Sequence, residues 1–174
     1  MTYEIKKYGD PVLKKKAEPV TEFGEDLKKI FDDMLETMYA FNGVGLAANQ
    51  VGILKQMITI DTSREEDRVI LYLANPVVTS VSKDKVTFEE GCLSFPGIFE
   101  KIDRPAKITV SAFDPYGKPL KIEAEGFLAI VLQHEIDHLN GVVFIDRMSP
   151  ARKFTHGKEL KELKTATKTG AKLK

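Results

Sequence analysis

The stretch GFLAIVLQHEIDHLN, residues 126–140, decides how this 174-residue chain is organised. Apolar side chains occupy almost every turn of it, which predicts a helix buried against a sheet. We expect this helix to run from about Gly126 to Asn140 and to end at Gly141. Two histidines, a glutamate and an aspartate interrupt the apolar pattern. Burying these polar residues without hydrogen-bond partners would cost free energy, so their presence in a buried helix indicates a functional role.

The two histidines of this helix have the spacing of metal ligands. His134 and His138 are four residues apart, so their imidazoles leave the same face and can meet at one ion. Glu135 completes an HExxH pattern, in which the carboxylate takes a proton from metal-bound water without being a ligand. The alternative is a helix whose histidines have only structural partners, and the cost of burial argues against it.

A catalytic metal site needs three protein ligands and an open position, so a third ligand must be found. It can lie downstream, at His156 or Glu159, or upstream at Cys92 in EEGCLSFPG. We favour Cys92, because Gly91 permits close approach of the backbone and the polar neighbours are unusual for a core cysteine. His156, by contrast, lies in a lysine-rich segment that is expected to be exposed.

The rest of the chain supplies an amphipathic helix and several strands. The helix lies in TEFGEDLKKIFDDMLETMYAFNG, begins at Thr21 or near Glu25 and stops at Gly43. Strands are predicted at residues 56–60, 68–74, 77–82, 107–114 and 120–125. Turns are expected at Asn75-Pro76 and in DPYGKP, residues 114–119.

A third, polar helix is predicted to begin with Ser149 as N-cap and Pro150 in the first turn, and to run to about Leu163. The order of elements indicates an α+β fold. In this fold, mainly antiparallel strands pack around the buried HExxH helix, with an amphipathic N-terminal helix and a polar C-terminal helix.

The composition is that of a globular protein with one main domain. Lys plus Arg and Asp plus Glu both number 26, so the net charge predicts neither specific DNA binding nor a membrane partner. No apolar run approaches the ~18 residues of a membrane span. With a single cysteine and no apolar leader at the N-terminus, we expect a cytoplasmic protein.

The end of the chain differs in charge from the rest. Residues 151–174 hold eight lysines and arginines against two glutamates. We expect residues 1–150 to form the catalytic domain and residues 151–174 a basic helix or tail that can be partly disordered. Such a tail is suited to contact the ribosome, since phosphate attracts lysine. The alternative is a solvated helix with a frayed end.

Three motifs together resemble those of one enzyme family. They are GVGLAANQ at Gly43–Gln50, EGCLS at Glu90–Ser94 and HEIDH at His134–His138. At every fixed position they match the motifs G-x-G-L-A-A-x-Q, E-G-C-L-S and H-E-x-D-H of the peptide deformylases. The resemblance extends from the N-terminal region to about Met148.

This resemblance implies a hydrolase that removes the N-formyl group from the starting methionine of newly made proteins and releases formate. The implied ion is natively Fe²⁺, which Zn²⁺, Ni²⁺ or Co²⁺ can replace. Its implied ligands are Cys92, His134 and His138. The implied catalytic groups are Glu135 as general acid and base, and the Gln50 side-chain amide and Leu93 backbone N–H as donors to the oxyanion.

Substrate contacts are expected on two sides of this site. Val44 and Gly45 can pair their backbone with an extended peptide, and Gly91 permits a close approach. Phe127, Ile130 and Val131 precede His134 on its side of the helix and can line an apolar pocket for methionine. For these three, ordinary core packing is the alternative. An HExxH zinc metallopeptidase that uses His156 or Glu159 is the competing function.

Overall fold

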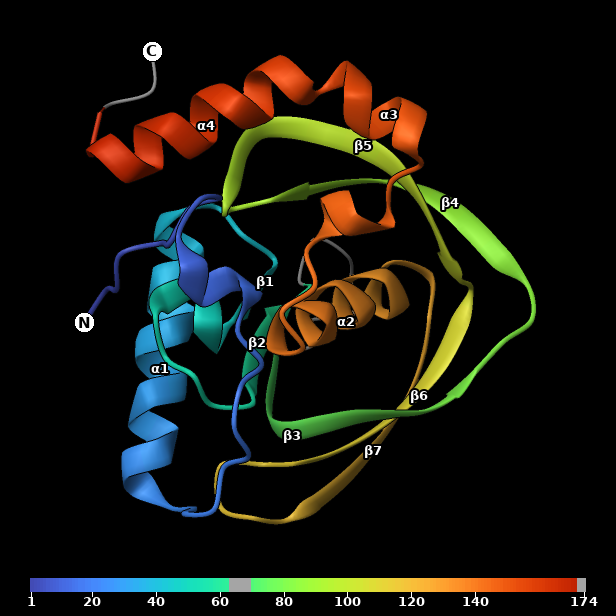
Figure 1. Cartoon of the computed structure of the whole chain (residues 1–174). Coiled ribbons are helices and arrows are strands. Elements are labelled where there is room, and N and C mark those ends of the chain that lie inside the picture. The colour runs from blue at the N-terminus through green and yellow to red at the C-terminus, as the bar shows by residue number, and fades with distance from the viewer. Residues whose placement is uncertain (63–69, 172–174) are drawn as a thin grey trace.

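The computed structural model describes residues 1–62 and 70–171 of the chain (Figure 1). Its α-helices are α1 (Glu25–Ala40), α2 (Gly126–Leu139), α3 (Pro150–Thr155) and α4 (Gly157–Thr169). Its strands are β1 (Gly45–Ala47), β2 (Met57–Asp61), β3 (Ile70–Val81), β4 (Lys85–Cys92), β5 (Phe95–Pro105), β6 (Lys107–Phe113) and β7 (Pro119–Glu125). Short 3-10 turns are η1 (Pro11–Lys14), η2 (Ala48–Val51) and η3 (Phe144–Arg147).

The strands form two antiparallel sheets, which confirms the predicted α+β class. The larger sheet has the order β1-β2-β3-β6-β7, and β4 and β5 form a separate two-stranded sheet. Helix α2 lies between the two sheets, α1 flanks the β1–β2 end, and α3 and α4 lie across the outside of β5 (Figure 1). No helix of the described part of the chain is long and apolar enough to span a membrane.

Helix α2 is central because its apolar residues fill the core against the large sheet. Residues from the helix and from β2, β3 and β6 contribute to this core, namely Ala129, Val131, Leu132, Ile136 and Leu139 with Ile58, Ile60, Leu73, Ile108 and Val110. Burial of each large aliphatic side chain stabilises the fold by roughly 1.5–3 kcal/mol. The helix spans Gly126–Leu139 with Asn140 as C-cap, so its prediction from the sequence is confirmed.

The predicted turn at Asn75-Pro76 is wrong, because β3 continues through it. Asn75 has a left-handed φ of 52°, and the strand pairing shifts register between Ala74 and Val77. Its side chain accepts a hydrogen bond from Val20 N at 2.7 Å and donates one to Val20 O at 2.9 Å. The dipeptide therefore makes a bulge that ties the strand to the N-terminal segment. Residues 68 and 69 of the predicted strand 68–74 lie outside the described residues.

Two other elements also differ from the predictions. The β4–β5 hairpin was not predicted at all. The single predicted C-terminal helix is divided at His156 into α3 and α4, and α4 extends to Thr169. Of the two starts predicted for the first helix, Thr21 and Glu25, the structure has Glu25, after Gly24 as N-cap.

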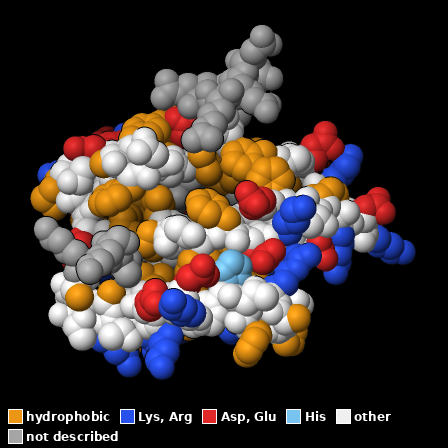
Figure 2. Space-filling view, turned by 90° about the horizontal axis from the view of Figure 1, so that it is seen from above, with side chains coloured by type: hydrophobic (Ala, Val, Ile, Leu, Met, Phe, Trp, Pro, Cys, Tyr) orange, Lys and Arg blue, Asp and Glu red, His pale blue; other side chains and the backbone are white. Residues whose placement is uncertain are grey.

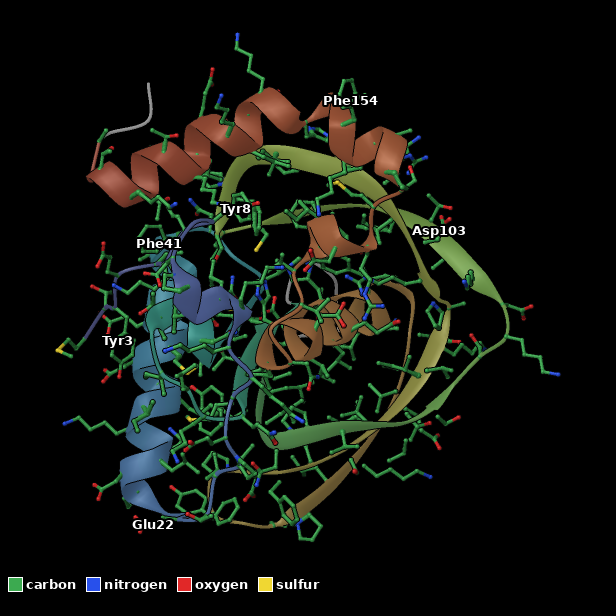
Figure 3. All side chains as sticks on the ribbon, viewed as in Figure 1. Tyr3, Tyr8, Glu22, Phe41, Asp103 and Phe154 are labelled. Atoms are coloured by element: carbon green, nitrogen blue, oxygen red, sulfur yellow. The ribbon has the colours of Figure 1, made fainter. Side chains whose placement is uncertain are left out.

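The C-terminal helices are docked on the hairpin. Leu160 and Leu163 of α4 are buried in a cluster with Phe95, Ile98 and Ile102 of β5. The opposite side of α3 faces outward, where Phe154 projects away from the body of the molecule (Figure 3).

Candidate metal centre and peptide cavity

Two separate elements bring a thiol and two imidazoles together. Cys92 ends β4, while His134 and His138 lie one turn apart on α2. The Nε2 atoms of the two histidines are 3.3 Å apart, and Cys92 Sγ is 3.3 Å from His138 Nε2. The ligand atoms of all three lie within 4.8 Å of one another. Two nitrogens at about 2.0–2.1 Å from a tetrahedral ion would lie about 3.3–3.4 Å apart, so this donor set fits one metal ion.

The downstream candidates do not join this cluster. His156 Nδ1 lies 2.8 Å from Glu159 Oε2, and its Nε2 lies 3.1 Å from Glu100 Oε2 on β5. Both residues are therefore engaged at the junction of α3 and α4 rather than at the histidine pair of α2.

The two histidines differ in protonation. His134 Nδ1 lies 2.8 Å from Glu90 Oε1 and donates to that carboxylate, which directs Nε2 at Cys92 and His138. Burial would lower the pKa of His134, but hydrogen bonds to Cys92 and Glu90 outweigh it and raise that pKa well above its usual value, so a metal ion would take the place of the Nε2 proton. Burial and the neighbouring His134 lower the pKa of His138, so its ring is neutral near pH 7. His138 Nδ1 has no hydrogen-bond partner in the described part of the chain.

Glu135 has the environment of a proton carrier. Its side chain is buried, and its Oε2 has no hydrogen-bond partner among residues 1–62 and 70–171. Burial raises the pKa of this carboxyl to about 7, which suits proton exchange near neutral pH. A Cβ on Gly45 would lie 2.7 Å from Glu135 Oε1 and 2.9 Å from Val131 Cγ1. Glycine at position 45 therefore makes room for the carboxylate.

The side-chain amide of Gln50 faces the same cluster. Its Oε1 accepts a hydrogen bond from Ala47 N at 2.9 Å, which leaves the NH₂ group directed at the β4–β5 hairpin. There Nε2 is 3.2 Å from Ser94 Oγ and 3.5 Å from Cys92 Sγ. The position of the amide is consequently fixed from both ends.

A cavity of about 600 Å³ opens beside these groups. It is lined by the catalytic candidates Gln50, Leu93 and Glu135, the ligand candidates Cys92 and His134, and all six predicted substrate contacts, Val44, Gly45, Gly91, Phe127, Ile130 and Val131. Fully buried His138 lies beyond its lining. In the view from above, hydrophobic side chains gather in the centre and upper half, and charged ones along the right-hand and lower edges (Figure 2).

Some lining residues were missed by sequence reasoning. Phe41, which follows α1, and Phe99 on β5 reach the cavity and are half exposed. The ring of Phe99 covers the hairpin backbone so closely that a Cβ on Gly91 would lie 2.5 Å from it. Gly91 does permit a close approach, as expected from the sequence, but the group that approaches its backbone is the Phe99 ring.

A chain of ion pairs, buried at Glu90 and Arg104 and exposed at Arg147, extends from the metal-ligand candidates. Arg104 Nε and Nη2 bind the two oxygens of Glu90 at 2.6 and 2.9 Å, and Nη1 binds Asp137 at 2.9 Å. Arg147 binds Asp137 from the other side at 2.6 and 3.0 Å. Burial would raise the pKa of Glu90, but hydrogen bonds from His134 and Arg104 outweigh it and lower that pKa. Glu90 therefore stays ionised.

A buried helix whose two histidines meet a thiol at 3.3 Å, with a buried glutamate and a cavity of about 600 Å³ beside them, defines a metal-dependent hydrolase. The family model described as polypeptide deformylase matches residues 2–154. A peptide deformylase from Thermodesulfovibrio yellowstonii is 49% identical over 162 residues, which is 92% of this chain and 98% of that protein. One from Thermotoga maritima is 45% identical over 166 residues, 95% of this chain and 99% of its own length. The crystal structure of peptide deformylase from Thermus thermophilus superposes with a TM-score of 0.88 at 41% identity and covers 95% of this chain and 99% of its own.

The chain belongs to the polypeptide deformylase family. It is a hydrolase of protein N-terminal processing that removes the N-formyl group from nascent peptides. The competing HExxH metallopeptidase is not favoured, since every relative named above is a deformylase.

Proposed function

We propose that the chain hydrolyses the formyl amide of formylmethionyl peptides at an ion held by Cys92, His134 and His138. The observation that carries the proposal is the carboxylate of Glu135. It is buried, its Oε2 has no partner in the described chain, and it lines the same cavity as two of the three ligand candidates. A divalent ion bound there would lower the pKa of a water molecule toward neutrality and polarise the formyl group.

In this proposal Glu135 handles the proton. It accepts the proton of the attacking water and then delivers it to the leaving amine, which becomes the free N-terminus of the peptide. The raised pKa of its carboxyl supports both steps, because a group with a pKa of about 7 gains and loses a proton with little cost near neutral pH.

We propose that two hydrogen-bond donors stabilise the negative charge that develops on the formyl oxygen. The first is the Nε2 amide of Gln50, whose direction is fixed by its hydrogen bonds to Ala47 and Ser94. The second is the backbone N–H of Leu93, next to Cys92 in the cavity lining. A preorganised donor of this kind is worth about 10²–10³ in turnover.

We assign the peptide to the free side of β1. This three-residue strand pairs with β2 alone in the sheet order, so it lies at an edge, where Val44 and Gly45 can pair with an extended substrate. Phe127, Ile130 and Val131 enclose the methionine side chain, and Gly91, which leaves room for the Phe99 ring, lines the hairpin side of the same cavity.

Formate release from formyl-Met-Ala-Ser tests the ligand and proton assignments. Metal-loaded Cys92→Ala and Glu135→Gln are expected to lose at least about 10²-fold in kcat, the effect of removing an essential catalytic group. His156→Ala serves as the control, because a metallopeptidase-type third ligand there would make it equally inactive. Full activity in Cys92→Ala, or loss of it in His156→Ala, would overturn the ligand assignment.

We further propose Fe²⁺ as the native ion and the cytoplasm as the location, where formylated chains are made. Anaerobic purification followed by metal analysis is expected to give about one iron per chain. Zn²⁺, Ni²⁺ or Co²⁺ restores activity after removal of iron. One zinc and no iron after such a purification would contradict the assignment.

We propose residues 151–174 as a basic segment separate in function from residues 1–150, and the ribosome as its partner. The lysines at 158, 161, 164 and 168 are exposed, while Leu160 and Leu163 hold α4 on the hairpin. Replacing these four lysines with glutamine is expected to abolish co-sedimentation with ribosomes. The matched control replaces the exposed lysines 83, 85, 118 and 121 and is expected to leave it unchanged. Equal binding by both variants would refute the idea.

A further inference from the structure

The three ligand candidates come from elements that have to be held in register with one another. Cys92 belongs to the β4–β5 hairpin, which forms its own sheet, whereas both histidines belong to α2. The distance between the thiol and the imidazoles therefore depends on how the hairpin is fixed against the helix.

Arg104 is the residue that joins these two elements beside the ligands. Its side chain is 4% exposed. One edge of its guanidinium binds both oxygens of Glu90, two positions before Cys92. The remaining nitrogen binds Asp137, the residue before His138. One planar group thus fixes the strand and the helix at positions next to their ligands.

The same group also acts on the orientation of an imidazole. Glu90 Oε1 receives both Arg104 Nη2 and His134 Nδ1, at 2.9 and 2.8 Å. Arg104 holds this oxygen in place, and the oxygen in turn sets the plane of the His134 ring and the direction in which its Nε2 points.

We propose that Arg104 is a positioning residue of the metal centre, which sets the geometry of Cys92, His134 and His138 through Glu90 and Asp137. The inference rests on the ligand assignment proposed above. Other contacts also join the hairpin and the helix without involving Glu90 or Asp137, namely Gln133 to Pro105 O at 3.1 Å and the ring pair Phe88–Phe127. These contacts remain when Arg104 is replaced, so the fold and the metal geometry can be separated.

The test compares Arg104→Lys with Arg147→Lys. Both variants keep their charge, and both lose a guanidinium that binds Asp137, but only Arg104 contacts Glu90. A lysine carries its three donors on one nitrogen, so it cannot reproduce the planar arrangement in which three nitrogens of Arg104 bind Glu90 and Asp137. Co²⁺ is the probe, because its visible spectrum reports coordination geometry and its affinity can be measured by competition with a chelator.

We expect Arg104→Lys to weaken Co²⁺ binding by about 10–100-fold and to alter the visible bands. We expect Arg147→Lys to change affinity less than about threefold and to leave the spectrum as in wild type. Wild-type affinity and spectrum in Arg104→Lys would overturn the proposal, and so would equal defects in both variants.

Two further measurements keep the outcomes distinct. Should Arg104→Lys fail to fold by circular dichroism, Glu90→Gln decides, because it removes the charge that holds Arg104 yet keeps an acceptor for His134. An unaltered Co²⁺ spectrum and affinity in folded Glu90→Gln would overturn the proposal. Wild-type protein that binds no Co²⁺, or Cys92→Ala that binds it as tightly as wild type, would instead refute the ligand assignment.

Discussion

Gly45 shows how a missing side chain serves a catalytic group. In Gly45→Ala, the new Cβ would overlap Glu135 Oε1 at 2.7 Å and Val131 at 2.9 Å, so the carboxylate has to move. A displacement of about 1 Å costs roughly 10²-fold in rate, and we expect kcat of the metal-loaded variant to fall by that order. The measurement is steady-state release of formate from formyl-Met-Ala-Ser.

Gly157→Ala is the matched control, because a Cβ there meets nothing within 4 Å. It is expected to keep wild-type kcat. If Gly45→Ala stays within twofold of wild type while binding its metal normally, the carboxylate does not depend on the space at position 45.

The candidate site could be read from the sequence only where local spacing carries the information. His134 and His138 are visible because four residues make one turn of a helix. Cys92 could be favoured through its neighbours, but its contact with His138 joins positions 46 apart, which no spacing rule gives. The link from Arg104 to both Glu90 and Asp137 likewise depends on how the hairpin lies on α2.

Among the elements, α2 was predictable and the β4–β5 hairpin was not. Apolar residues at nearly every turn and a terminal Gly141 mark the helix. Strand β4 exposes most of its residues on both faces, so its sequence KVTFEEGC lacks the alternation of a half-buried strand. At Asn75-Pro76, a side chain bonded to distant Val20 converts an expected turn into a bulge. Such long-range partners override local propensity.

Helix α4 is expected to be part of the cooperative unit rather than an appended tail. Leu163 is 3% exposed and packs in the cluster with β5. Leu163→Ala should therefore lower the free energy of unfolding by about 2–5 kcal/mol. Phe154→Ala, which truncates a residue 86% exposed on α3, should change it by less than about 0.5 kcal/mol. Urea unfolding curves of the two variants measure the difference, and equal values would mean that α4 unfolds independently.

The junction of α3 and α4 should respond to pH through His156. Hydrogen bonds to Glu159 and Glu100 raise the pKa of this imidazole against the opposing effect of burial. A raised pKa in the folded state means that the stabilisation is complete below the unfolded pKa of about 6.5. It is lost as pH increases through the higher pKa of the folded state.

The free energy of unfolding of wild type and His156→Gln, measured from pH 5.5 to 8.5, checks this sign. The advantage of wild type is expected to be largest at the acidic end and to shrink as pH rises. A difference that is constant over the range would show that His156 contributes through packing alone.

At the scale of the whole molecule, the proposed ion should stabilise the fold. It would join the β4–β5 hairpin to α2, whose apolar residues belong to different hydrophobic clusters. A ligand at about 100 times its dissociation constant adds roughly 2.7 kcal/mol, which for a chain of this size corresponds to about 5–10 °C in Tm. Thermal unfolding with Co²⁺ and after chelation measures it, and Cys92→Ala is expected to lose most of the shift. Equal Tm values for wild type under both conditions would contradict a bridging ion.

Because Cys92 lies far from the two histidines in the sequence, no short segment of the chain contains all three ligand candidates. A peptide that copies α2 has the imidazoles but no thiol, and the fragment that ends after β5 has the thiol alone. A chain cut at the β6–β7 connection, between Asp114 and Lys118, would give two halves that each lack part of the donor set. The absorption spectrum of Co²⁺ bound to one thiolate and two imidazoles would then arise only when the halves reassociate. This spectrum would therefore measure the reassociation of the cut protein.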